Sequence, residues 1–147
     1  MNTEAMTKLA DVMETIEPEA FNMAYYWGDA PSNICGTAGC LAGWQTHTGP
    51  SAETVRRLED RRITVDHFEI ATRDLGLTRG EARELFTNPY WWGEAFLKLG
   101  LRDTTWYRKY IHEFSTSPLS EGFDLAKITS KEAVIVLRAL VDGTLTL

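Results

Sequence analysis

The sequence is poor in the residues that build disulfide scaffolds and metal centres. Its 147 residues include two cysteines, Cys35 and Cys40, and three histidines. Two thiols are too few for a disulfide scaffold, and a chain of this length can bury an adequate core without one. No second pair of Cys or His with finger-like spacing follows the two cysteines. We therefore expect reduced thiols, no metal site and no cofactor.

Long apolar runs are also missing. The longest uninterrupted one covers residues 133–137, whereas a membrane-spanning helix needs about 20 apolar residues. The N-terminal residues alternate apolar with charged side chains and lack the basic start and apolar block of a secretory signal. These absences predict a cytoplasmic protein that makes no contact with a membrane.

Positive charge is scarce in the first third of the chain. The net charge is −6, and residues 1–50 hold six acidic side chains against Lys8 alone. Non-specific nucleic-acid binding needs a surplus of Lys and Arg facing the phosphates. A helix-turn-helix over residues 65–86 is the alternative, but Glu81 and Glu84 make its second helix a poor complement to phosphate. We expect a core helical hairpin there, and nucleic acid is an unlikely partner.

Amphipathic helical periodicity dominates what the sequence does contain. It predicts an all-α protein, a compact bundle of six or seven helices with residues 1–147 in a single domain. Capping boxes open two of these helices, Thr78 with Glu81 and Thr129 with Glu132. The alternating tail 144–147 could add a short strand at the C-terminus. The helices are expected at residues 3–17, 37–49, 52–62, 65–75, 78–86, 104–114 and 129–143.

An aromatic segment follows Asn88. Because Pro89 fixes its own φ and lacks an N–H donor, we predict a loop over residues 88–93. Three consecutive rings on a loop cannot all point inward, so we predict a contact surface, with basic residues nearby in sequence facing an acidic partner. The alternative is that the rings plug the end of the core. The predicted binding residues are Tyr90, Trp91, Trp92, Arg102, Arg108 and Lys109.

The most distinctive string is CGTAGCLAGW, residues 35–44. A glycine inside a helix costs about 1 kcal/mol relative to alanine, so Gly39 and Gly43 indicate a close helix contact that offsets this cost. The remaining motif residues fit structural roles. They would form a turn, an N-cap, a buried thiol and an aromatic ring that fills the space beside the close helix contact. These residues are Cys35, Gly36, Thr37, Cys40 and Trp44.

The same string resembles the C-G-T-x-x-C-x-A-G-W signature of a set of small helical proteins encoded by bacteria and bacteriophages. The similarity also takes in residues 21–23, 76–86 and 128–140. The resemblance implies a helical fold and a phage or mobile-element origin. It supplies no catalytic residues.

A nucleophilic cysteine is the enzymatic alternative. Cys40 is expected in the first turn of a helix, where the helix dipole can lower the pKa of a thiol. A cysteine nucleophile also needs a base within hydrogen-bond reach. His47 is seven residues further along that helix, about 10 Å away at 1.5 Å per residue, and cannot serve. A buried structural cysteine is the preferred interpretation, and no catalytic residue is predicted.

Taken together, these features predict a small intracellular interaction or regulatory protein that binds a host or partner protein non-covalently. Self-association into a homo-oligomer is compatible with this prediction. Two alternatives stay open: a small-ligand or nucleotide-binding module built on the aromatic and glycine-rich segments, and a thiol-dependent enzyme that uses Cys40.

Overall fold

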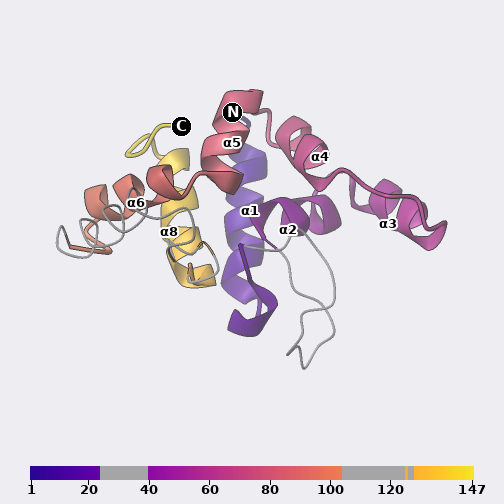
Figure 1. Cartoon of the computed structure of the whole chain (residues 1–147), viewed down its shortest axis with the longest axis horizontal. Helices are drawn as coiled ribbons and strands as arrows, with labels where there is room; N and C mark the ends of the chain where they lie inside the picture. The colour runs from indigo at the N-terminus through magenta and orange to yellow at the C-terminus, as the bar shows by residue number, and fades with distance from the viewer. Residues whose placement is uncertain (24–39, 104–124, 126–127) are drawn as a thin grey trace, which may run out of the picture.

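Seven α-helices account for most of the chain that the structure describes. The structure is a computed structural model, and it describes residues 1–23, 40–103, 125 and 128–147 (Figure 1). No strand occurs in these residues, so the expected all-α fold is confirmed. A short 3-10 helix, η1 (Pro18–Ala20), accompanies α1 (Thr3–Thr15), α2 (Leu41–Thr48), α3 (Ala52–Asp60), α4 (His67–Asp74), α5 (Arg79–Thr87), α6 (Pro89–Lys98) and α8 (Ser130–Val141).

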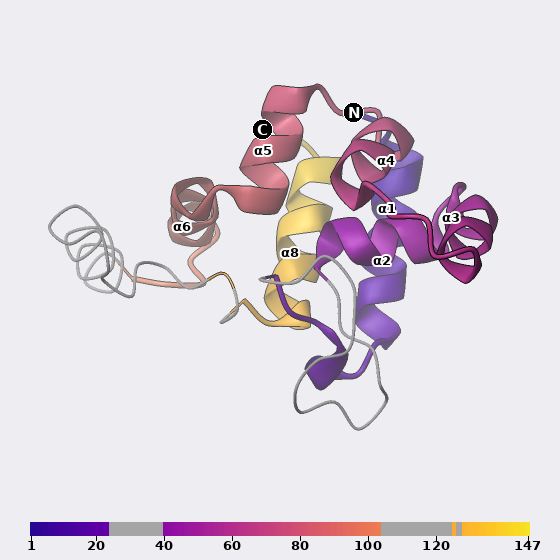
Figure 2. The same cartoon turned by 45° about the vertical axis from the view of Figure 1, so that its right-hand side comes forward.

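The first and last of these helices form the centre of the core. Helices α1 and α8 lie side by side along their length, as Figures 1 and 2 both show. Apolar side chains of α1 recur every three or four residues, which places them on one face toward α8. Each fully buried leucine or methionine there stabilises the fold by about 1.5–3 kcal/mol. The α1 contribution consists of Ala5, Met6, Leu9, Ala10 and Met13.

Helix α3 is attached differently from the others. The continuous hydrophobic core takes buried residues from the other six α-helices and none from α3. Helix α3 buries only Ala52 and Val55, and it lies at the edge of the molecule (Figure 1). At its N-terminal end, the Ser51 backbone N–H and hydroxyl both donate to Asp74 of α4, at 3.2 and 2.9 Å. Helix α3 is therefore held outside the continuous core, by two buried side chains together with polar contacts to α4.

The end of α3 turns the chain sharply toward α4. Arg62 has a φ of +58°, in the left-handed region that glycine normally occupies after a helix. Its backbone N–H donates to Glu59 O at 2.7 Å, and the N–H of Ile63 donates to Leu58 O at 3.0 Å. These two bonds satisfy the last carbonyls of α3 and reverse the chain. Glu59, in the last turn, is thereby brought opposite the start of α4.

The aromatic segment after Asn88 is a helix, so the predicted loop is wrong. The Asn88 side chain caps α6 by accepting from the backbone N–H of Tyr90 at 3.0 Å. Pro89 is the first residue of α6. Proline is tolerated there because the first N–H groups of a helix have no intrahelical partner to lose.

Two further expectations need correction. Helix α2 begins at Leu41 with Cys40 as its N-cap residue, three residues later than an N-cap at Thr37 predicts. The tail 144–147 forms no strand; instead the Leu145 N–H donates to Ala139 O at 2.9 Å and its side chain is buried. The tail thus folds back on the end of α8. The expected helix 104–114 lies outside the described residues.

Candidate metal centre

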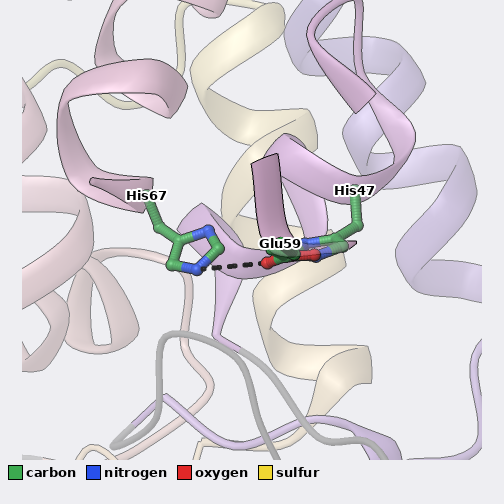
Figure 3. A group of neighbouring side chains, drawn as sticks. All are labelled: His47, Glu59 and His67. Atoms are coloured by element: carbon green, nitrogen blue, oxygen red, sulfur yellow. Dashed lines mark hydrogen bonds and ion pairs between the residues drawn. The ribbon is translucent and has the colours of Figure 1, made fainter. Parts of the chain in front are cut away.

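Three side chains from three successive helices converge at one point (Figure 3). His47 is in the last turn of α2, Glu59 in the last turn of α3, and His67 is the first residue of α4. The Nε2 atom of His47 lies 3.1 and 3.0 Å from the two carboxylate oxygens of Glu59. The Nε2 atom of His67 lies 3.9 Å from Glu59 Oε1. One ligand atom from each residue falls within 4.8 Å of the others.

The cluster is sheltered but open on one side. The side chains of His47 and His67 are 9% and 14% exposed, and that of Glu59 is 34% exposed. The two imidazole rings face each other with centroids 5.4 Å apart. Solvent or a ligand therefore reaches the cluster past the Glu59 carboxylate.

Contacts on the far side of both rings favour the tautomer with the proton on Nδ1; His47 Nδ1 also lies 3.2 Å from the Thr46 hydroxyl oxygen. Nδ1 of His47 lies 2.9 Å from Gly43 O, and a carbonyl can only accept, so this nitrogen carries a proton. The buried Thr46 hydroxyl donates to the same carbonyl at 2.8 Å, which leaves its oxygen to accept from Nδ1 of His67 at 2.9 Å. When the imidazoles are neutral, both Nε2 lone pairs consequently face Glu59.

The short contact between His47 and Glu59 needs a bridging proton or cation. A neutral Nε2 and a carboxylate both accept hydrogen bonds, so their 3.0 Å approach at His47 needs either a proton or a metal ion between them. At His67, burial and then the neighbouring His47 lower the pKa, although Glu59 and Asp66 oppose the shift. His67 thus keeps the neutral form that binds metals to a lower pH than usual. Because the unfolded chain takes up this proton more readily, acidification below about pH 6.5 costs stability.

The donor set suits a first-row divalent ion. Two imidazole nitrogens and a carboxylate oxygen are ligands that Zn²⁺ holds at about 2.0–2.2 Å. The hydrogen bonds on Nδ1 are the outer contacts that orient metal-binding histidines. Only small side-chain movements are needed to close the present separations onto one ion. These three ligands leave at least one coordination position open.

Spacing analysis missed this cluster because its residues are 12 and 8 positions apart on three different helices. Finger-like patterns put ligand pairs two to five residues apart. The remaining signal in the sequence is weak. Two of the three histidines lie at the ends of two short helices, and a third short helix lies between those two. The turn at Arg62 and the packing of α2 against α3 and α4 bring them together.

The structure separates the predicted aromatic contact residues. Tyr90 is 39% exposed, Trp91 is half-buried, and Trp92 is 0% exposed. Trp91 Nε1 donates to Thr146 O at 3.2 Å, and Trp92 Nε1 donates to Leu85 O at 2.8 Å. The ring of Trp92 is therefore core and is not accessible to a partner.

The basic residues predicted near these rings do not form a described rim. Arg102 is half-buried, lies 5.5 Å from the centroid of the Phe96 ring and forms an ion pair with Glu132. It thus joins α6 to the start of α8. Arg108 and Lys109 lie outside the described residues.

The described part of the CGTAGCLAGW string packs as a structural motif. Gly43 is buried in α2 and its carbonyl holds the Thr46 and His47 side chains. Trp44 is half-buried and its Nε1 donates to Ala20 O at 3.2 Å. Cys40 is 2% exposed. Cys35, Gly36, Thr37 and Gly39 lie outside the described residues.

Cys40 should react slowly with thiol reagents in the native protein. Burial raises the pKa of its thiol, and backbone hydrogen bonds to the sulfur only partly offset this. The thiolate is the reactive species, so both its low population and its poor access slow the reaction. We would follow 5,5′-dithiobis(2-nitrobenzoate) with Cys35→Ser, with and without urea. Equal rates in the folded and unfolded states would restore the thiol-enzyme alternative.

Comparisons with known proteins identify no relative of this chain. No protein-family model, no curated protein and no solved structure matches the chain. Among the described helices, none has the length and apolar character needed to cross a bilayer.

Proposed function

We propose that this chain binds one divalent transition-metal ion, with Zn²⁺ the best fit, through His47, Glu59 and His67. The observation that carries the proposal is the convergence of both Nε2 atoms and the carboxylate while Gly43 and Thr46 occupy the opposite nitrogens. Imidazole ligands favour Zn²⁺ and its neighbours over Mg²⁺ and Ca²⁺, which prefer oxygen.

We propose further that the ion serves non-covalent binding to a partner. The open coordination position can accept a side chain from another protein, which would link metal binding to the interaction or regulatory role that the sequence predicts. The resemblance of residues 35–44 to small bacterial and phage proteins supports a setting inside a bacterial or phage-infected cell.

The ion would also link α3 to α2 and α4. This helix contributes nothing to the continuous core, and Glu59 is its contact with both histidines. An ion bound by the native state alone stabilises the fold, by about 2.7 kcal/mol when its free concentration is 100 times Kd. Metal binding is therefore expected to raise the melting temperature as well.

Substitution of either Glu59 or His67 should weaken Zn²⁺ binding more than about 100-fold, because loss of an outer contact alone typically costs 10–100-fold. Glu59→Gln and His67→Gln keep side-chain size, and Thr46→Val removes only the outer hydroxyl, with a loss of about 10-fold or more expected. Isothermal titration calorimetry at neutral pH measures each affinity. Binding should also weaken on acidification, as protons begin to compete with the ion at His67, whose pKa lies below its ordinary value.

Glu53→Gln is the matched control. Glu53 lies on the same helix, its side chain is exposed, and among the described residues it pairs with Arg57 four positions further on. It should bind Zn²⁺ as the wild type does. Equal affinity of the Glu59→Gln and Glu53→Gln variants would refute the proposed site.

A further inference from the structure

A second concave feature lies between α1 and the end of α2. It has a volume of about 440 Å³ and shares no residue with the metal site. Its α1 side offers the apolar Ala5, Leu9 and Val12, and its α2 side offers Gln45 and Gly49. A volume of this size falls within the range of small-ligand pockets, about 300–1,000 Å³.

Gln45 is unusual among the buried polar residues. It is 2% exposed, it lines the hollow, and within the described part of the chain its carboxamide has no hydrogen-bond partner. A buried polar group left unsatisfied costs about 1–3 kcal/mol, so such groups are rare in folded proteins. Within the described residues, this amide is therefore left able to pair with a ligand in the hollow.

Gly49 holds this amide in place. A Cβ atom at Gly49 would overlap both Gln45 Nε2 and the Gln45 backbone oxygen, so the carboxamide and the end of α2 both pack directly against the glycine backbone. Gly49 has a φ of −82° and an extended ψ, which any residue can adopt. Glycine is thus required at this position because a side chain there would collide with Gln45, and not because of its backbone conformation.

We infer that this hollow binds an extended peptide segment of a partner protein, with the Gln45 carboxamide pairing with the backbone N–H and C=O of one residue of that segment. A carboxamide offers an acceptor oxygen and two N–H donors, and in an extended segment the N–H and C=O of one residue point to the same side. The floor of Ala5, Leu9 and Val12 would take a small apolar side chain of that segment.

The charges at the rim fit a neutral backbone better than a strongly charged ligand. Glu4 and Lys8 line the hollow and pair with each other at 2.7 Å. Opposite charges at one edge favour neither a polyanion nor a polycation. The pair is exposed, so it contributes little stability and can open to admit a ligand.

The test uses capped trialanine, N-acetyl-(Ala)₃-amide, as the probe. Gln45 is the single glutamine of the chain, so comparison of wild type with Gln45→Leu assigns its side-chain NH₂ signals in a ¹H–¹⁵N spectrum. We expect a saturable shift of these signals at millimolar probe. The response should be absent from backbone signals near the hollow in Gln45→Leu. It should be several-fold weaker in Gly49→Ala, whose Cβ displaces the amide and also crowds the Gln45 backbone oxygen at the end of α2.

The melting temperature of each variant shows whether a loss of probe binding arises from a folding defect. Gln45→Leu should melt at or above the wild-type temperature, because it removes a buried amide that has no partner. A clear drop would show that the amide has a structural role and would overturn the inference. So would the absence of a saturable shift in the wild type, equal binding to Gln45→Leu, or equal binding of acetamide, which would mark a small-amide site.

Discussion

Trp92→Ala is expected to lower the free energy of unfolding by about 3–5 kcal/mol, the usual cost of truncating a buried aromatic side chain. The ring is fully buried and meets the rings of Trp91 and Phe96 edge to face, at centroid distances of 5.6 and 5.7 Å. Its Nε1 also donates to Leu85 O across the junction of α5 and α6. Alanine leaves both a cavity and a buried carbonyl that has lost this donor. Urea unfolding followed by circular dichroism measures the change.

Trp91→Ala provides the matched comparison on the neighbouring residue. Trp91 is half-buried and its hydrogen bond reaches the exposed Thr146. We expect a loss of about 1 kcal/mol, the typical net value of one hydrogen bond plus partial burial. Equal losses for the two variants would contradict the assignment of Trp92 alone to the core.

Tyr90 and Trp91 stay the predicted contact residues of this segment, and a pulldown with Trp91→Ala addresses that role.

Glu132→Ala should cost about 2 kcal/mol, more than an ordinary helix cap, because one carboxylate has three partners. Glu132 accepts from the Thr129 N–H at 2.9 Å and hydroxyl at 3.0 Å, and it forms the ion pair with Arg102. Its side chain is 12% exposed. Loss of a cap costs about 1 kcal/mol, and removing one partner of a sheltered charge pair adds to this. Thermal and urea unfolding both report the change.

The second capping box separates the two contributions. Glu81 accepts from the Thr78 N–H at 2.7 Å and is largely exposed in the same reciprocal arrangement. Glu81→Ala should therefore cost about 0.5–1 kcal/mol, the capping effect alone. If Glu132→Ala costs no more than Glu81→Ala, the pair with Arg102 adds nothing to the stability of α8.

Local signals in the sequence were sufficient for most helix boundaries. Both capping boxes form as expected, because each is a reciprocal contact within four residues. The failure at α6 came from treating Pro89 as a breaker although Asn88 before it is a strong N-cap residue. A proline ends a helix when it follows several turns and begins one when it follows a cap.

The candidate metal centre depends on information that is not local. His47, Glu59 and His67 meet because α3 ends in a left-handed arginine and because α2 packs against both α3 and α4. A left-handed Arg is uncommon, and its sequence gives no sign of it. Likewise, the Gln45 amide, which has no hydrogen-bond partner among the described residues, lies where α1 packs on α2. Such features follow from the tertiary arrangement and not from periodicity or spacing.

The pairing of α1 with α8 also bears on synthesis of the protein. During translation, the apolar face of α1 that carries Met6, Leu9 and Met13 leaves the ribosome more than 100 residues before Val141 of α8. Contacts between such distant segments form late, since the chain must close a long loop before they stabilise anything. The nascent chain therefore exposes this face for most of its elongation. Chaperones that shield apolar nascent segments would therefore meet α1 first.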